Sequence, residues 1–472
     1  MNGVPAHQSA HQTKNSLQHD LGIRLVKGLN VMLIALPFAL CWFGYCAKHV
    51  VLFPSSYRSV GMILMFVLLY FFFGRVYDAF LVSIKRISEM FYGQVLGILM
   101  ADAFMFLILW FMSGEFPNLI PALAALAGQL TLSYLWCWQA HLWYFNRFAG
   151  KKTAIVYDVR RGMEDLFGEY GLDKKFNVQS VCSVEECLAQ EMRMLRNMDS
   201  VFLCGVHSHD RNIILKYCVF NNINVYMIPR IGDVIMSGAK RTHMFHLPIL
   251  RVGRYNPPIE FVILKRLFDI VSSALVIMVT SPIMIGVAIA IKAYDGGPVF
   301  YKQTRLTKDG KKFKILKFRS MRTDAEKDGV ARLSTGENDD RITPVGHFIR
   351  ACRLDELPQL FNILGGSMSV VGPRPERPEI AAQYEEEMPE FALRLQAKAG
   401  LTGYAQVFGK YNTIPYDKLQ MDLMYIANPS LLEDLRIIFA TIQVLFQKES
   451  TEGVAAGQTT AESTAMKEEK SA

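Results

Sequence analysis

The residues with the clearest chemical potential lie in one segment, Arg350-Ala-Cys-Arg-Leu-Asp355-Glu356-Leu-Pro358-Gln359. Because proline is tolerated in the first turn of a helix, Pro358 predicts that Asp355 is a helix N-cap and that Glu356 lies in the first turn. Such a carboxylate can simply cap the helix. Beside arginines, the two acids can also hold Mg²⁺ and phosphate, and a carboxylate can attack phosphorus as a nucleophile.

Two basic motifs accompany this acidic pair. The first, Lys317-Phe-Arg319-Ser-Met, lies in a basic stretch that by itself is typical of a solvated surface. The second, Val371-Gly-Pro373-Arg374-Pro-Glu, fixes the backbone around one arginine with two prolines, which suits a guanidinium to bidentate phosphate contact. Each motif is weak alone, but together with the acidic pair they favour a site for a phosphorylated substrate.

Apolar stretches before residue 146 predict a membrane protein. They run over Leu29–Ala47, Val60–Phe80, Gln94–Met112 and Ile120–Leu142. Each is close to the roughly 20 residues that a helix needs to cross the hydrocarbon core. Of the 472 residues, 51% are hydrophobic and 20% are charged, which excludes a wholly disordered chain, and the net charge of +8 is too small to favour nucleic acid. We predict a cytoplasmic arm over 1–28 and a four-helix transmembrane bundle over 29–146.

Basic residues predict the orientation of this bundle. They precede the first stretch, separate the second from the third and follow the fourth: Lys14, Arg24, Lys27, Lys85, Arg86, Arg147, Lys151 and Lys152. The positive-inside rule therefore places the N-terminus and everything after residue 146 in the cytoplasm. Asp102 lies inside the third stretch, where an acid is either functional or paired; we favour a hydrogen bond with Gln129 at similar depth.

Residues 147–255 are predicted to form a Rossmann-like α/β domain. Short apolar runs alternate with helix-like segments, at Thr153–Tyr157, Phe176–Val181, Val201–Gly205 and Ile223–Ile228. No G-x-G-x-x-G follows the first run, so we expect no dinucleotide site. Some histidines and one cysteine have spacing that zinc could use, namely Cys204, His207, His209, His243 and His246. Since Cys204 ends an apolar strand, we expect no metal there.

A fifth apolar run, Val271–Ile291, is also long enough to cross a membrane. Basic residues flank both of its ends, which places both ends in the cytoplasm. Ser281 and Pro282 lie at its middle, and proline kinks a helix. We therefore predict a re-entrant helix over 266–292, hinged at this pair, within a catalytic domain over 256–447. The alternative, a fifth full span, would put every later motif outside the cell. Residues 448–472 are predicted to be a disordered tail.

The order of these motifs resembles one family. KRLFDI at 265–270, the Ser281-Pro282 break, KFRSM, DELPQL and VGPRPE occur in the order found in bacterial polyprenyl-phosphate glycosyl-1-phosphate transferases of the monotopic type, in their long form. Gly400-Leu-Thr-Gly also matches, whereas Ala399 and Pro429 depart from the usual pattern. The apolar segment after Pro429, residues 431–446, is expected to be an interfacial helix.

The resemblance implies a multi-pass protein of the bacterial inner membrane with a mainly α, cytoplasmic catalytic domain. Asp355 would attack the β-phosphorus of a UDP-sugar, release UMP and carry the phosphosugar until undecaprenyl phosphate accepts it, which starts surface polysaccharide synthesis. Glu356 would bind Mg²⁺ together with Asp355 and assist removal of a proton from the acceptor. Arg350 and Arg374 would neutralise charge on the phosphates.

Further implications of the resemblance concern binding residues and partners. The implied substrate-binding residues are Arg374, Pro373, Lys317, Arg319, Gln359, Asp422 and Asp434. A homodimer is expected, with membrane lipids as partners and no nucleic acid, and glucose-1-phosphate or galactose-1-phosphate as the transferred group. The alternative function is a non-enzymatic membrane scaffold or sensor that regulates polysaccharide export. A nucleoside-triphosphate phosphotransferase is disfavoured because the sequence has no G-x-x-x-x-G-K-[ST].

Overall fold

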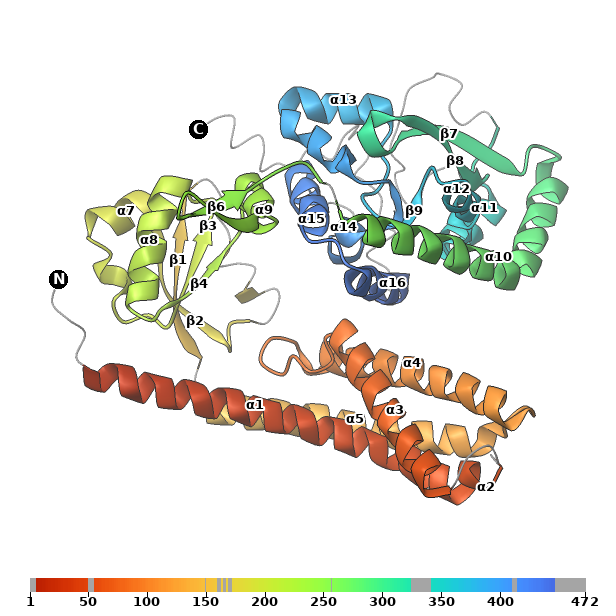
Figure 1. The fold of residues 1–472 in the computed structure, drawn as a ribbon, viewed down its shortest axis with the longest axis horizontal. Helices are drawn as coiled ribbons and strands as arrows, with labels where there is room; N and C mark the ends of the chain where they lie inside the picture. Colours follow the sequence, from red (N-terminus) through yellow and green to blue (C-terminus); the bar gives the residue numbers. More distant parts are fainter. Residues whose placement is uncertain are drawn as a thin grey trace. The chain divides into compact units, whose positions relative to one another are not determined.

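The structure is a computed structural model that describes residues 6–49, 55–148, 150–158, 163, 167–168, 172–255, 257–323, 341–409 and 414–445. The chain divides into two compact units, with the boundary between Ile228 and Pro229 (Figure 1). The predicted tail over 448–472 lies outside the described residues. The predicted domain boundary at residue 255 differs from this division, because residues 229–255 belong to the second unit.

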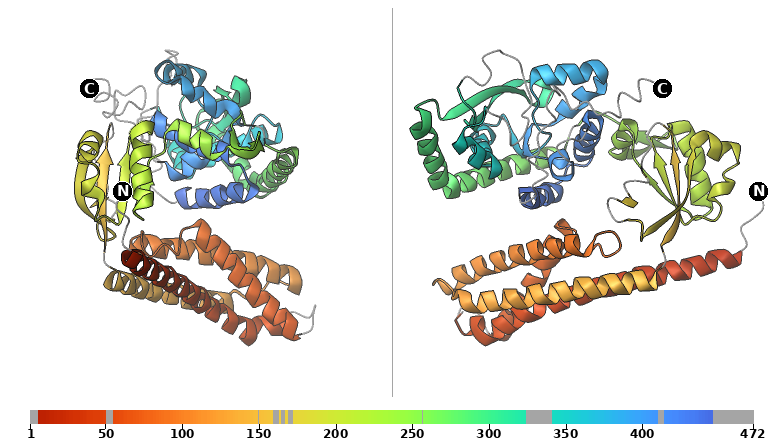
Figure 2. Two further views of the ribbon diagram at one scale, coloured as in Figure 1. Left: turned by 60° about the vertical axis from the view of Figure 1, so that its left-hand side comes forward. Right: turned by 180° about the vertical axis from the view of Figure 1, so that it is seen from behind.

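Long apolar helices make up the first part of the first unit. They are α1 (Ala6–Cys41) with a π-helical turn (Trp42–Cys46) and α2 (Ala47–His49), then α3 (Ser55–Val76), α4 (Ile87–Ser113) and α5 (Leu119–Arg147). Within them, His19–Cys46, Ser59–Val76, Ile87–Ser113 and Leu119–Arg147 are long and apolar enough to cross a membrane. The predicted apolar helices are therefore confirmed, although α1 begins inside the predicted arm. Helices α1 and α5 lie side by side (Figures 1 and 2).

Polar side chains inside these helices pair with one another. Gln129 Nε2 donates a hydrogen bond to Asp102 Oδ1 at 3.3 Å, which confirms the predicted pairing. A second, fully buried group joins α1, α3, α4 and α5 through hydrogen bonds of 2.6–3.2 Å: Asn30, Tyr70, Gln94 and Ser133. An unpaired polar group is costly in an apolar environment, so these bonds favour one packing arrangement of the helices.

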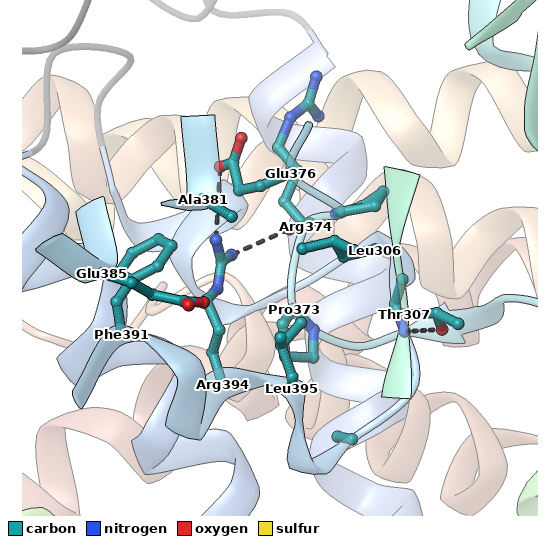
Figure 3. Close-up of a pocket in the computed structure, with 13 residues that line it drawn as sticks. Leu306, Thr307, Pro373, Arg374, Glu376, Ala381, Glu385, Phe391, Arg394 and Leu395 are labelled. Atoms are coloured by element: carbon teal, nitrogen blue, oxygen red, sulfur yellow. Dashed lines mark hydrogen bonds and ion pairs between the residues drawn. The ribbon is translucent and has the colours of Figure 1, made fainter. Parts of the chain in front are cut away.

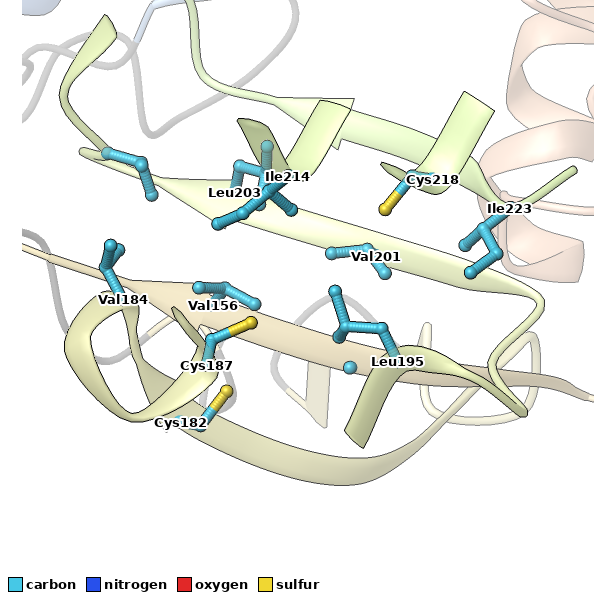
Figure 4. Close-up of a cluster of buried hydrophobic side chains, with 12 residues drawn as sticks. Val156, Cys182, Val184, Cys187, Leu195, Val201, Leu203, Ile214, Cys218 and Ile223 are labelled. Carbon is cyan, nitrogen blue, oxygen red and sulfur yellow. The ribbon is translucent and has the colours of Figure 1, made fainter. Parts of the chain in front are cut away.

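A four-stranded parallel sheet forms the rest of the first unit, as predicted. Its strands are β1 (Lys151–Tyr157), β2 (Phe176–Ser183), β3 (Ser200–Cys204) and β4 (Asn224–Met227), in the order β2-β1-β3-β4. Helices α7 (Val184–Ala189) and α8 (Ser208–Phe220) pack apolar side chains on it, and Cys187 and Cys218 act there as small apolar residues (Figure 4). Cys204 is buried at the end of β3, and His207 Nδ1 lies 2.5 Å from Asp158 Oδ2.

The second unit is mixed α/β rather than mainly α. Its helices are α9 (Ile231–Ser237), α10 (Ile259–Asp295), α11 (Pro344–Ala351), α12 (Gln359–Leu364), α13 (Pro378–Glu387), α14 (Tyr404–Phe408), α15 (Pro415–Ala427) and α16 (Leu431–Leu445). Three two-stranded sheets accompany them: β5 (Lys240–Met244) with β6 (Leu247–Arg251), β7 (Phe300–Leu306) with β8 (Lys312–Phe318), and β9 (Ser369–Val371) with β10 (Gly400–Thr402). The long basic stretch is thus partly a β-hairpin.

Helix α10 contains the fifth apolar run and bends part-way along its length (Figure 1). Pro282 lies inside the helix and has no amide to donate to the carbonyl of Met278, one turn earlier. Ser281 Oγ donates to that carbonyl instead, at 2.9 Å. The serine therefore satisfies the acceptor that the proline leaves unpaired, which explains why the two residues occur together at a bend in an apolar helix.

Candidate active site

The backbone around the acidic pair is tighter than predicted. Arg353 adopts a left-handed conformation (φ 56°), and a 3₁₀ turn follows over Leu354–Glu356. Helix α12 begins only after Pro358, whose φ of −62° and ψ of −16° are already helical. The prediction that Asp355 is a helix N-cap is therefore wrong, because Asp355 lies inside the 3₁₀ turn and the N-cap of α12 is Pro358. The carboxylate is available for other contacts.

Lys317 reaches the acidic pair from the β7–β8 hairpin. Side chains alternate between the two faces of a strand, so Lys317 shares the face of Ile315, which is buried. Lys317 Nζ lies 2.9 Å from Glu356 Oε1 and 4.0 Å from Asp355 Oδ2. One ammonium group thus faces both carboxylates. The alternation of side chains along β8 directs Lys317, the first residue of the KFRSM motif, toward the acidic pair.

Arginines surround the same carboxylates. Arg374 follows β9, and its NH2 lies 3.4 Å from Glu356 Oε1 with 45% of the side chain exposed. The positive charges of Arg350 and Arg353 act on Asp355 from the end of α11 and the turn after it. The structure therefore brings two acids and several cations into one place, a combination suited to binding and transferring a phosphate-linked group.

The two carboxyl groups differ in acidity. Burial raises the pKa of Asp355, and the negative charge of Glu356 adds to this, while Lys317 and the nearby arginines oppose it. Burial would also raise the pKa of Glu356, but the charges of Lys317, Arg374 and Arg353 outweigh burial and hold that pKa well below its ordinary value. Glu356 therefore stays ionised at ordinary pH. The cations around Asp355 stabilise its ionised form too little to outweigh the effect of burial.

Beneath Arg374, a buried arginine fixes the loop that carries it (Figure 3). Arg394 is 3% exposed; its Nε donates to Asp422 Oδ2 at 2.9 Å and its NH1 to Glu376 Oε1 at 3.4 Å. Its Nη2 donates to the carbonyl of Arg374 at 2.9 Å, and Arg305 Nη1 donates to the carbonyl of the next residue, Pro375, at 3.0 Å. The backbone of the Pro-Arg-Pro motif is thus held by two arginines rather than by its prolines alone.

Helix α10 supports the site through polar residues near its beginning. Arg266 donates from NH1 and NH2 to the carbonyls of Ile363 and Leu364, both at 2.7 Å, at the end of α12. Asp269 Oδ1 accepts from the backbone amide of Val370 in β9 at 2.9 Å. These contacts tie the apolar helix to the helix after the acidic pair and to the strand before the Arg374 loop.

The remaining predicted residues lie in different surroundings. Arg319 is buried in an ion pair with Asp295 at the end of α10. Asp434 accepts hydrogen bonds from Lys265 Nζ at 2.6 Å and Tyr425 OH at 2.8 Å. Gln359 is buried in the first turn of α12, and Pro373 lines the hollow around Arg374. Asp422 accepts a hydrogen bond from the buried Arg394. Substrate binding by these five residues stays a prediction.

The donor set fits Mg²⁺ only in combination with a substrate. Among the described residues, no group of three or more His, Cys, Asp and Glu side chains could hold a metal ion. Asp355 and Glu356 supply two adjacent carboxylates. Mg²⁺ commonly takes one or two carboxylates and completes its octahedron with water and substrate phosphates. The pair therefore suits an ion that arrives with a diphosphate rather than one held by protein ligands alone.

Comparison with known proteins places this site in a family. Residues 260–448 match the family described as bacterial sugar transferase. An exopolysaccharide production protein of Rhizobium leguminosarum bv. phaseoli is 44% identical over 191 residues, which are 38% of this chain and 94% of that protein. The chain belongs to the bacterial sugar transferase family. The family resemblance predicted from the motifs is confirmed, and every residue of the acidic pair and its cations lies within the sugar transferase domain.

Longer members of the sugar transferase family match over the same region. The N-acetylgalactosaminephosphotransferase of Aeromonas hydrophila, which uses UDP-N-acetylgalactosamine and undecaprenyl phosphate, is 37% identical over 49% of this chain and 54% of its own. The UDP-glucose:undecaprenyl-phosphate glucose-1-phosphate transferase of Escherichia coli K12 is 38% identical over 46% of this chain and 48% of its own. The matched region thus spans about half the length of these relatives.

Sequence reasoning missed Arg394 and Arg305. Neither residue belongs to a motif, and an arginine in a run such as Phe-Ala-Leu-Arg394-Leu-Gln is usually on the surface. A buried arginine needs partners, and these come from positions far apart in the sequence. Only the tertiary structure could identify them.

The position of Lys317 predicts a pH effect. If Asp355 is the nucleophile that the resemblance implies, it must be ionised, and covalent capture of the donor should fall as the pH drops through its raised pKa. Lys317→Met removes a cation that lowers this pKa; the acidic limb of the capture rate should therefore move to higher pH. Lys317→Arg keeps the charge and should keep the limb near its original position. The measurement is the initial burst of UMP against pH without acceptor, and an unmoved limb in Lys317→Met would contradict the assignment.

Proposed function

We propose that this protein transfers a sugar-1-phosphate from a UDP-sugar to undecaprenyl phosphate and so starts synthesis of a surface polysaccharide. The observation that carries the proposal is the adjacent Asp355 and Glu356 facing Lys317, with Arg350 and Arg374 close by. Relatives named for UDP-sugars and undecaprenyl phosphate share this domain. A scaffold or sensor has no need for a buried carboxylate in a cationic cluster, so the transferase is favoured over that alternative.

In the first step, Asp355 is the nucleophile. A carboxylate oxygen bonds to the β-phosphorus of the UDP-sugar while the bond from that phosphorus to the bridging oxygen breaks. UMP leaves with the bonding electron pair, and the phosphosugar stays on Asp355 as an acyl phosphate. The guanidinium of Arg374 and the ammonium of Lys317, which lie beside the acidic pair, would neutralise the charge that develops on the leaving phosphate.

In the second step, a phosphate oxygen of undecaprenyl phosphate bonds to the same phosphorus. The acyl-phosphate bond breaks, which restores the Asp355 carboxylate and forms the lipid diphosphate sugar. Glu356 serves this step as a fixed negative charge that holds Lys317 and Arg374 in position. Its low pKa suits that role better than the removal of a proton from the acceptor.

Asp355 and Glu356 would hold Mg²⁺ when it arrives with the donor diphosphate. The ion would supply positive charge that neutralises the diphosphate oxygens. The protein side chains would orient the donor through Lys317 and Arg374 and exclude water by the burial of Asp355.

We infer that the first unit holds the four-helix transmembrane bundle in the inner membrane, and that α10 is a re-entrant helix with the catalytic domain in the cytoplasm. Exposed apolar side chains on both sides of the Ser281-Pro282 bend support this, including Met278, Val279 and Ile285. A helix that enters and leaves by one face would hold the acidic pair where a membrane lipid and a soluble nucleotide can both reach it. A homodimer is also part of the proposal.

Thiol labelling in intact cells tests the topology. On a background with Cys46→Ser and Cys352→Ser, Lys312→Cys should be shielded from an impermeant thiol reagent, because β8 follows the re-entrant helix on the cytoplasmic side. Glu115→Cys, in the connection between α4 and α5, should be labelled from outside and serves as the control. Labelling of Lys312→Cys from outside would show that α10 crosses the membrane.

The activity is tested with the purified full-length protein in lipid nanodiscs. UDP-glucose, UDP-galactose and UDP-N-acetylgalactosamine are offered in parallel with undecaprenyl phosphate, and UMP release is measured. At least one donor should give acceptor-dependent release together with a lipid-linked sugar. No release with any UDP-sugar, from protein that is folded and bound to membrane, would favour the scaffold.

A further inference from the structure

A cavity of about 610 Å³ lies in the first unit, whereas the acidic pair belongs to the second. Part of its wall is the connection between α3 and α4 with the beginning of α4, and part is the last half of α5. The rest comes from the segment just before β2. Its volume is in the range of pockets that bind small ligands. Its lining includes Lys85 and Arg86, two of the basic residues that predict which ends of the apolar helices face the cytoplasm. The cavity thus lies at the predicted cytoplasmic end of these helices.

Cations dominate the charged groups of this cavity. Those lining it are Lys85, Arg86, Lys174 and Lys175, against the single acid Asp173. Asp78 pairs with Lys85 at 3.5 Å from outside the lining, and His141 also faces the cavity. Lys175 Nζ donates to Ser83 Oγ at 3.4 Å, and Ser83 also lines the cavity. The four cations outnumber Asp173 and Asp78, and this excess of positive charge favours an anion in the cavity.

Aromatic side chains complete the wall on the side of the apolar helices. Phe91 comes from α4, and Tyr134 and Phe145 come from α5. Tyr134 and Trp138, one turn apart on α5, are both exposed, so an apolar chain could leave the cavity along this side of the helix. A soluble phosphate would use the cations but not this aromatic wall. A phosphate attached to a lipid would use both, since its acyl or prenyl chain continues into the bilayer.

We propose that this cavity binds the phosphate headgroup of an anionic membrane lipid, with the cations around the phosphate and the lipid chain along α4 and α5. The site is distinct from the acidic pair, and it rests on the proposed function only through the placement of the helices in the membrane. Its role is to join the α3–α4 connection, α5 and the segment before β2 through a specific lipid at the membrane surface.

Protonation of Lys175 offers a supporting signature. Burial and the neighbouring charge of Lys151 lower the pKa of Lys175 to about 8. A bound phosphate would raise that pKa, so lipid binding should weaken as the pH rises above about 8. Lys175→Arg keeps its charge throughout this range, and its binding should depend less on pH.

The test uses the full-length protein in phosphatidylcholine nanodiscs that contain phosphatidic acid with a photoreactive acyl chain. Crosslinks should map to residues 83–91 and 134–145. Lys174→Gln with Lys175→Gln should reduce the crosslink yield by about tenfold or more, because each lysine near the surface contributes strongly to anionic-lipid binding. Lys174→Arg with Lys175→Arg should restore the yield, and it separates loss of binding from loss of folding.

The control removes the same charge elsewhere on the first unit. Arg196→Gln with Lys216→Gln changes two exposed cations outside the cavity and should leave the yield within about twofold of the original. An equal loss in this control would reduce the effect to general electrostatics and overturn the proposal. Displacement of the probe by millimolar inorganic phosphate would overturn the assignment to a lipid. UMP release is measured on the same samples, so a failure here is distinguishable from a failure of the proposed transferase.

Discussion

Asp355→Asn should abolish covalent capture of the phosphosugar and lower turnover by about 10⁴-fold. The amide is nearly isosteric, so the 3₁₀ turn over Leu354–Glu356 should persist. Its oxygen cannot form the acyl-phosphate bond, however. Since the N-cap of α12 is Pro358 and not Asp355, the loss cannot be attributed to a helix cap. The measurement is the intact mass of the protein after incubation with a UDP-sugar and no lipid acceptor, in which the unchanged protein should gain the mass of a phosphosugar.

Two further variants sharpen this result. Glu390→Gln changes an exposed acid in the same domain and should capture the phosphosugar normally. Glu356→Gln keeps the nucleophile but loses the charge that holds Lys317 and Arg374, so its activity should fall severely and recover in part with added Mg²⁺. A phosphosugar adduct on Asp355→Asn, or near-normal turnover by that variant, would rule out Asp355 as the nucleophile.

Arg394→Met should destabilise the sugar transferase domain by about 3–5 kcal/mol, because it leaves Asp422 buried without its cation. For a domain of this size, the midpoint of thermal unfolding should drop by on the order of 10 °C. Arg322→Met replaces an exposed arginine in the same way and should change stability by no more than about 0.5 kcal/mol. Equal midpoints for the two variants would show that the buried pair contributes nothing to stability.

A double variant separates stability from the positioning of Arg374. Arg394→Met with Asp422→Leu removes both members of the buried pair, and apolar replacements of such pairs are often neutral. Glu376 keeps a partner in Arg305, 3.9 Å away. The double variant should therefore recover much of the thermal stability, while turnover stays low because the carbonyl of Arg374 has lost its donor. Full recovery of turnover would limit Arg394 to a structural role.

The pattern of hydrophobic residues was sufficient to predict most helices of the first unit and its parallel sheet. Runs of about 20 apolar residues have few alternatives to a helix, and short apolar runs separated by helix-like segments indicate a parallel sheet. Both features depend on local sequence, which explains their agreement with α3–α5 and with β1–β4. The pairing of Asp102 with Gln129 followed from the cost of an unpaired acid at that depth.

Errors arose where the local signal supported two structures. Pro358 is compatible with a helix that begins at Asp355 and equally with one that begins after the proline. In the structure, the left-handed residue Arg353 is followed by a 3₁₀ turn, and α12 begins after Pro358. The basic residues of the β7–β8 hairpin concealed its alternation. Within the site, the motifs identified the acidic pair, Lys317 and Arg374, but not the buried Arg394, because burial depends on residues distant in sequence.

The bend of α10 and its polar contacts restrict how many residues the helix can have between Asp269 and Pro282. An α-helix turns by about 100° per residue. One residue inserted between Asp269 and Pro282 would therefore rotate the bend around the helix axis while Arg266 and Asp269 stayed bonded to α12 and β9. The arm beyond the bend would then leave in a different direction. We expect that gaps in an alignment of family members fall before or after this helix, and that its length varies far less than the lengths of the loops.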